Sequence, residues 1–115
     1  MPSNNDLSTF SNWTEEDKDL FTVAVIKGLI MDTVRNANSG HTGGPMSSAD
    51  FSYLLFSKYM NFDPDNSEWF NRDRFILSAG HESALLYTLL TLIGWLKIDD
   101  LQQFRQLHSK TPGHP

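Results

Sequence analysis

Cysteine is absent from the 115-residue sequence, and its absence excludes several kinds of site. Without a thiol the chain can form no disulfide, no thiolate metal site and no cysteine nucleophile. The composition is compatible with a reducing compartment. We therefore expect a cytoplasmic protein.

A long apolar run is also missing, because Lys27 and Asp32 interrupt the best candidate. A membrane helix needs roughly 18 apolar residues, so we expect no membrane span. Residues 1–11 have neither the basic nor the apolar region of a signal peptide. We interpret residues 1–13 as a flexible lead-in and residues 14–115 as one domain.

Basic residues are scarce: nine Lys and Arg stand against fourteen Asp and Glu, for a net charge of −5. Binding to nucleic acid or to an anionic membrane needs a surplus of positive charge on one face. We expect neither partner. The sequence contains no GxGxxG, no phosphate-loop lysine motif and no HExxH. Its four histidines are too scattered to predict a metal site, so we expect no metal ligands in this chain.

What the sequence does contain is a strong helix signal near its start. Thr14, followed by three acidic residues, is typical of a helix N-cap with favourable charges in the first turn. Apolar residues then recur at spacings of three and four, which predicts a buried helix over residues 15–36. Asn38 and Gly40 tolerate the left-handed conformation that ends a helix.

Three shorter helices should follow. Ser47 with Asp50 forms a weak capping box for the first of them. The second covers about residues 84–93 and is closed by Gly94. The third begins near Asp100 and runs through Leu107.

The apolar run Phe75–Leu77 predicts one short buried strand near 75–78. Just before it, Arg72 and Arg74 flank Asp73. Two arginines could bind a phosphate through their guanidinium groups. The alternative, which we favour, is a local ion pair that holds the entry to the strand.

His41 lies in the glycine-rich sequence Gly40–Pro45, between two predicted helices. Where side chains are missing, a ligand can approach the backbone closely. This predicts a site, but the pattern alone leaves open a plain connector with an exposed histidine.

Two more histidines lie in predicted turns. His81 joins a strand end to a helix start, where amide groups favour an anion such as a diphosphate; a merely solvated histidine is the alternative. His114 stands between Pro112 and Pro115, which restrict the backbone and suit substrate contact. The alternative for His114 is a mobile tail. We interpret His108 as a surface residue.

Three segments together resemble transketolase, in the right order and spacing: Asn38–Met46, Asp73–His81 and Phe104–Pro115. The resemblance begins at about residue 17 and covers nearly the whole chain. It implies that residues 14–115 are the incomplete N-terminal part of a thiamine diphosphate-binding domain. The implied fold is α/β, mostly helical in this segment, with its one short strand near 75–78.

The resemblance also implies roles for three histidines. His81 would bind the diphosphate of the cofactor. His41 would act in catalysis beside the reactive centre, binding sugar hydroxyls and assisting proton movement. His114, the second catalytic and substrate-binding residue, would contact the donor ketose. A neutral imidazole offers one donor and one acceptor, which suits these tasks.

The implied activity is transfer of a two-carbon ketol unit from a ketose phosphate to an aldose phosphate, as in the pentose phosphate pathway. Family members are several times longer, function with thiamine diphosphate and are expected to be homodimers. The ligands of their divalent metal, magnesium or calcium, would lie outside this chain. We therefore expect the chain alone to be inactive and to require the remaining transketolase segments or chains.

Two other interpretations remain. One is an enzyme like 1-deoxyxylulose 5-phosphate synthase, although Arg105–Pro115 matches transketolase better. The other is a non-catalytic helical interaction module. The sequence also departs from the usual transketolase pattern: Thr42 replaces proline, Gly44 replaces a frequent alanine, and Ala79–Glu82 replaces Asn-Gly-His-Gly.

Overall fold

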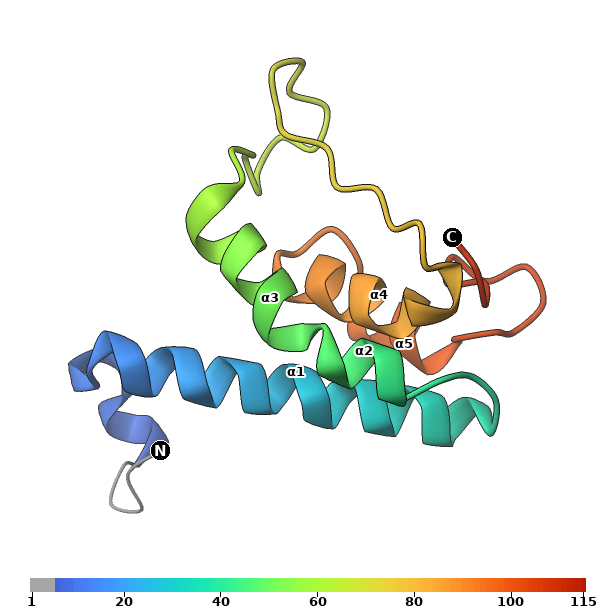
Figure 1. Ribbon diagram of the computed structural model, residues 1–115, viewed down its shortest axis with the longest axis horizontal. Coiled ribbons are helices and arrows are strands. Elements are labelled where there is room, and N and C mark those ends of the chain that lie inside the picture. The colour runs from blue at the N-terminus through green and yellow to red at the C-terminus, as the bar shows by residue number, and fades with distance from the viewer. Residues whose placement is uncertain (1–5) are drawn as a thin grey trace.

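The computed structural model describes residues 6–115, and its regular elements there are helical (Figure 1). In chain order they are η1 (Leu7–Asn12), α1 (Glu15–Ala37), α2 (Gly43–Ser47), α3 (Ala49–Leu54), the π-helical turn η2 (Leu55–Tyr59), η3 (Gly80–Glu82), α4 (Ser83–Leu92) and α5 (Ile98–Gln102). None of the described helices has the length and apolar character that crossing a bilayer requires.

The long helix α1 begins and ends where its caps predict. The Thr14 side chain accepts a hydrogen bond from the Asp17 amide at 3.1 Å, which satisfies one of the free amides of the first turn. At the other end Asn38 adopts a left-handed conformation with φ 50°. The helix predicted over residues 15–36 is confirmed.

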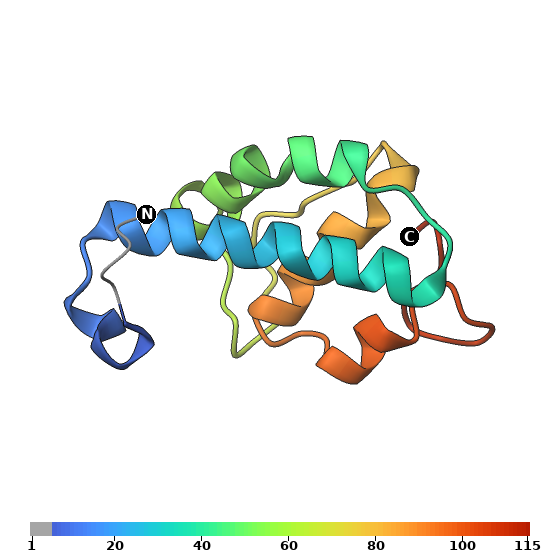
Figure 2. The same cartoon turned by 90° about the horizontal axis from the view of Figure 1, so that it is seen from below.

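The helices α2 to α5 all pack against α1. Figure 2 shows α2 and α3 along one edge of α1 and α5 along the other, with α4 passing behind α1 between them. Ile26 and Ile30 of α1 are fully buried, and Leu85 and Leu89 of α4 pack into the same core. The chain segments on both sides of α1 are thereby held at fixed positions relative to each other.

The second helix begins earlier than its predicted cap. Ser47 is the last residue of α2, and its hydroxyl donates to the Gly44 carbonyl at 3.1 Å instead of capping a helix. The helical path bends at Ser48 and continues as α3 and η2. The prediction of a cap at Ser47 is wrong because the glycines before it are already helical.

The last two helices are close to their predictions. The helix expected over residues 84–93 is α4, which ends before Gly94 with its φ of 92°. The short helix α5 includes Asp100, whose carboxylate accepts from the Lys97 amide at 2.9 Å. However, α5 ends at Gln102 rather than continuing through Leu107.

The short strand predicted near 75–78 is not formed within the described residues. Phe75 and Leu77 are half-buried and Ile76 is 86% exposed, so side chains alternate as in a strand. No backbone hydrogen bond joins 74–77 to another segment of residues 6–115. A strand needs a neighbouring strand to satisfy its backbone, and here the extended run has none.

The described part of the predicted lead-in contacts α1. Residues 1–5 of the predicted lead-in lie outside the described part. From Leu7 the chain forms η1, and Trp13 is buried against Phe10 and Phe21, with ring centroids 5.1 and 5.4 Å from its own. Three aromatic rings thus connect residues 7–13 to α1, and the flexibility of this segment stays a prediction.

Candidate functional site

The loop that carries His41 is fixed by its contact with the C-terminal segment. Gly40 has φ 124°, a conformation that side chains rarely adopt. A Cβ there would lie 3.0 Å from Cε2 of Phe104, so only glycine lets the ring approach. The guanidinium of Arg105 donates to the Ser39 hydroxyl at 3.3 Å. His41 therefore lies on a fixed turn, with its side chain exposed.

His81 lies in the 3-10 turn that precedes α4. We expected free amides here to bind an anion, but most of them already have partners. The Gly80 and Glu82 amides donate to the carbonyls of Ser78 and Ala79 at 3.0 and 2.8 Å, and the Ser83 amide donates to the Gly80 carbonyl. The expectation of free amides is wrong for these three groups, so anion binding would depend on the exposed His81 imidazole.

The loop that carries His114 is anchored to α4 by two hydroxyl groups. Ser83 donates to the Gly113 carbonyl and Tyr87 donates to the Pro112 carbonyl, each at 2.6 Å. Burial raises the pKa of the Tyr87 hydroxyl, which keeps it protonated as a donor. These bonds hold the two residues before His114, so this segment is not a loose tail.

A second set of contacts anchors the same loop to α5. Thr111 is fully buried, and its hydroxyl donates to the Asp100 carbonyl at 2.8 Å. The Thr111 carbonyl accepts from the Arg105 amide at 2.9 Å. Buried hydrogen bonds of this kind are costly to break, so the loop has a defined path.

The structure brings the three predicted histidines together from segments far apart in the sequence. The rings of His41 and His81 meet edge to face, with centroids 5.2 Å apart. A Cβ on Gly80 would lie 2.7 Å from Cδ2 of His114, so the third imidazole lies against the backbone beside His81. All three imidazoles are exposed. His108 is also exposed, as expected, and has a left-handed φ of 64°.

The anchoring hydroxyls of Ser83, Tyr87 and Thr111 were missed by sequence reasoning. Each donates to a backbone carbonyl distant in the sequence, and a carbonyl is present at every position. The sequence offered one signal: these hydroxyl-bearing residues stand among apolar residues that we expected to be buried. A buried hydroxyl group needs a hydrogen-bond partner.

Arg72 and Arg74 support the backbone of their own segment. Arg72 donates to the Trp69 carbonyl at 2.9 Å, and Arg74 donates to the carbonyls of Arg72 and Phe70 at 2.9 and 3.0 Å. Asp73 instead accepts from the Asn61 amide at 2.7 Å. Our prediction of a local ion pair is therefore wrong. The two arginines instead stabilise the backbone of their own segment.

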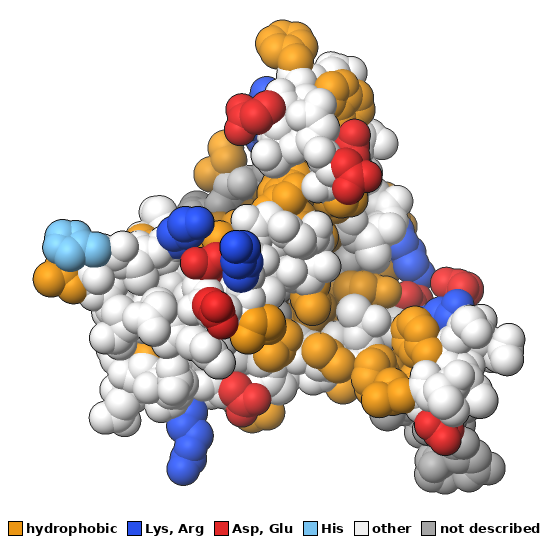
Figure 3. Space-filling view, turned by 180° about the vertical axis from the view of Figure 1, so that it is seen from behind, with side chains coloured by type: hydrophobic (Ala, Val, Ile, Leu, Met, Phe, Trp, Pro, Cys, Tyr) orange, Lys and Arg blue, Asp and Glu red, His pale blue; other side chains and the backbone are white. Residues whose placement is uncertain are grey.

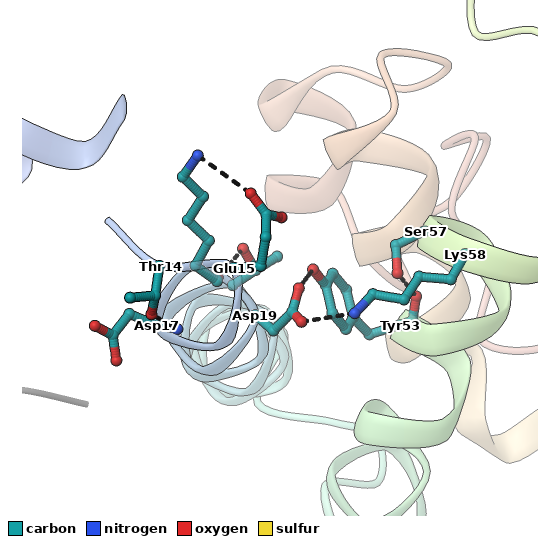
Figure 4. Close-up of polar contacts among 9 residues, drawn as sticks. Thr14, Glu15, Asp17, Asp19, Tyr53, Ser57 and Lys58 are labelled. Carbon is teal, nitrogen blue, oxygen red and sulfur yellow. Dashed lines mark hydrogen bonds and ion pairs between the residues drawn. The ribbon is translucent and has the colours of Figure 1, made fainter. Parts of the chain in front are cut away.

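A second polar cluster joins α1 to α3 and η2. Asp19 accepts from the Tyr53 hydroxyl at 2.5 Å and from the Lys58 ammonium at 2.8 Å, as Figure 4 shows. The Lys58 hydrogen bond, then that of Tyr53, lowers the pKa of Asp19. Burial and the bond to Asp19 raise the pKa of Tyr53. These hydrogen bonds join α1 to α3 and η2.

Within residues 6–115 no group of three or more His, Asp or Glu side chains is arranged to hold a metal ion.

The three histidines thus lie on one exposed face of a helical scaffold, in the order His41, His81 and His114 along the chain. The family model described as "Transketolase, thiamine diphosphate binding domain" matches residues 18–115. The chain belongs to the transketolase family.

Individual relatives agree with this assignment. Transketolase from Bacillus subtilis (strain 168) is 58% identical over 95 residues, which are 82% of this chain and 14% of the relative. Transketolase from Staphylococcus aureus (strain MW2) is 52% identical over 99 residues, which are 86% of this chain and 15% of the relative. The chain thus spans about one seventh of the length of the curated relatives that it matches.

Solved transketolase structures match a similar share of this chain. A crystal structure of transketolase from Pichia stipitis, in complex with sedoheptulose-7-phosphate, matches with a TM-score of 0.81 at 50% identity. The match covers 84% of this chain and 14% of that chain. The mostly helical fold predicted for this part of the domain is confirmed.

Proposed function

We propose that this chain supplies the histidine-bearing wall of a transketolase active site. In the complete enzyme this site would transfer a two-carbon ketol unit from a ketose phosphate to an aldose phosphate. The observation that carries the proposal is the meeting of His41, His81 and His114 on one exposed face. Imidazoles held by a fixed backbone provide oriented donors and acceptors for hydroxyl and phosphate groups.

The residues of this face fit thiamine diphosphate as the cofactor. Because Gly80 has no side chain, the His114 ring packs against the backbone beside His81, and the two neighbouring imidazoles could contact the same ligand. When bound, the cofactor supplies the carbon nucleophile and the electron sink of the reaction. His81 would then donate a hydrogen bond to a diphosphate oxygen.

The other two histidines would act on the sugar. His41, whose ring meets that of His81, would bind sugar hydroxyls and hold or move a proton beside the reactive centre. His114 would orient the donor ketose near its carbonyl end. Its backbone is held by Ser83 and Tyr87, so the imidazole can be placed without reorganising the loop.

The remaining parts of the site belong to other segments in this proposal. They would hold the divalent metal, magnesium or calcium, and complete the cofactor pocket in a cytoplasmic homodimer of the pentose phosphate pathway. The exposed histidines support this assignment of the remaining parts to other segments. Ketol transfer needs a site from which water is excluded, so other segments would have to cover the histidine face. The family model and the relatives support transketolase over an enzyme similar to 1-deoxyxylulose 5-phosphate synthase or a non-catalytic helical module.

Replacing His81 by alanine tests the proposal in an assembled enzyme, meaning this chain joined to the remaining transketolase segments. One route is to place residues 18–115 in the Bacillus subtilis transketolase instead of the matching segment. His81→Ala should weaken binding of thiamine diphosphate by about 1 to 3 kcal/mol, since it removes a charge-assisted hydrogen bond. Titration of cofactor against enzyme fluorescence measures this change.

The control for His81→Ala is the parent assembled enzyme, which should catalyse ketol transfer. A cofactor dissociation constant equal to that of the parent would remove His81 from the cofactor site. Absence of ketol transfer by the parent itself would contradict the proposed function as a whole.

A further inference from the structure

Glu82 and Gly44 make a close contact between the segments that carry two of the histidines. Glu82 directly follows His81, and Gly44 lies in the first turn of α2, three residues after His41. A Cβ on Gly44 would lie 2.6 Å from Oε1 of Glu82, 3.0 Å from its Cγ and 3.1 Å from its Cδ. The half-buried glutamate therefore occupies the space that a side chain at position 44 would need.

A hydrogen bond holds the same carboxylate at the other end of α2. The Ser48 hydroxyl donates to Oε1 of Glu82 at 3.4 Å, from the bend between α2 and α3. The glutamate thus contacts both the first turn of α2 and the residue that follows it. Within residues 6–115 no Lys, Arg or His side chain forms an ion pair with Glu82.

The two contacts link the residues at positions 44 and 82. Glycine at position 44 makes room, and Glu82 fills it and reaches Ser48. With alanine at 44, the carboxylate, Cγ and Cδ of Glu82 would all have to move. Alanine at position 44 would displace the Glu82 side chain, and alanine at position 82 would leave the space beside Gly44 unfilled.

We propose that Glu82 is a positioning residue that sets the spacing of His41 and His81 by filling the space left by Gly44. The proposal rests on the proposed function, because it assigns Glu82 to that same site. Glu82 acts through its shape and its hydrogen bond to Ser48 rather than through its charge. An amide of the same shape, in Glu82→Gln, should therefore take its place.

The test compares four variants of the assembled enzyme: Glu82→Ala, Glu82→Gln, Gly44→Ala and the double variant Gly44→Ala/Glu82→Ala. Glu82→Ala should lower kcat/KM for the donor ketose roughly tenfold, because small displacements of reacting groups can cost up to about 10²-fold. Glu82→Gln should stay within about twofold of the parent. Gly44→Ala should displace the glutamate and cause a similar loss.

The decisive result is non-additivity. Two changes that break the same contact should not add, so the double variant should be no worse than Glu82→Ala. Gly28→Ala is the matched glycine control, since a Cβ at Gly28 meets nothing within 4 Å. Glu68→Ala, at an exposed glutamate, is the control for loss of a carboxylate. Both controls should match the parent.

Three outcomes would overturn the role of Glu82. The first is an unchanged kcat/KM in Glu82→Ala, and the second is a double variant whose losses add. The third is a loss in Glu82→Gln equal to that in Glu82→Ala, which would mean that the charge of Glu82 matters and not its shape. If the parent assembled enzyme shows no ketol transfer at all, the proposed function fails first and the role of Glu82 fails with it.

Discussion

His114 is positioned by its neighbours in the chain. The carbonyls of Pro112 and Gly113 accept hydrogen bonds from Tyr87 and Ser83, so the backbone that carries the imidazole is fixed to α4. The ring itself lies against Gly80, where a larger residue would not fit. A side chain fixed in this way can contact a substrate without losing much conformational freedom on binding.

In the assembled enzyme, His114→Ala should impair use of the donor ketose more than binding of the cofactor. If the imidazole contacts strengthen as the donor reacts, the transition state should lose roughly 1 to 3 kcal/mol of stabilisation, so kcat/KM should fall about five- to 150-fold. Donor kinetics and a separate cofactor titration distinguish the two effects.

The control for His114→Ala is His108→Ala, since His108 is an exposed histidine of the same C-terminal segment. This variant should behave as the parent does. Equal losses of cofactor affinity and donor use in His114→Ala would mean that His114 supports the fold or the cofactor site, and its substrate role would have to be dropped.

At the scale of the elements, helices with local signals were predictable. The helix α1 follows from the Thr14 cap, the acidic first turn and the apolar spacing, all of which lie within the element itself. The helix α4 and its end before Gly94 follow in the same way. Local interactions decide such elements, so the sequence alone predicts them.

Elements that depend on distant partners were not predictable. The apolar run Phe75–Leu77 has the composition of a strand, but a strand forms only beside another, and no segment of residues 6–115 pairs with it. The helix start at Gly43 was missed because glycine is a poor helix former that packing can override. The histidines were found from their motifs, whereas Ser83 and Tyr87 were missed because their acceptors are distant backbone carbonyls.

The cluster of Asp19, Tyr53 and Lys58 makes the attachment of α1 to α3 and η2 dependent on pH. The pKa of Asp19 is lowered from its ordinary value of 3.8, chiefly by the Lys58 hydrogen bond. A carboxyl with a lower pKa when folded stabilises the fold above its unfolded pKa, and this contribution is lost as the pH falls through the folded pKa. The cluster should therefore weaken in acid, below the ordinary pKa.

Asp19→Asn should consequently lower the melting temperature of the assembled enzyme near neutral pH. The difference from the parent should shrink as the pH falls below about 4, where the parent also loses the charge. Thermal unfolding over a series of pH values measures this. Asp65→Asn, at an exposed carboxylate, is the control. A difference that stays constant into the acid range would argue against the ionised Asp19 as its source.

At the scale of the whole molecule, the described surface keeps many large apolar side chains exposed. Five examples are more than 60% exposed: Phe51, Tyr59, Phe70, Ile76 and Leu107. On the face shown in Figure 3, apolar side chains lie between scattered acidic and basic ones. Exposed apolar side chains in such number are typical of surfaces that other protein segments cover.

The same conclusion follows from the unpaired run 74–77 and from the exposed histidine face. The run 74–77 has the side-chain alternation of a strand but pairs with no other segment of residues 6–115. The histidine face is open to solvent, as one wall of a larger site would be. The matched relatives are about six times as long as this chain. We therefore propose that the chain contributes a histidine-bearing wall of the site, and that catalysis requires the segments that complete it.

The most direct test measures ketol transfer and thiamine diphosphate affinity for the purified 115-residue chain and for the assembled enzyme, each with and without magnesium. The chain alone should show no transfer and no metal-dependent affinity, because no metal-binding group was found among residues 6–115. The assembled enzyme should show both. Ketol transfer by the purified chain, free of companion chains, would contradict the claim.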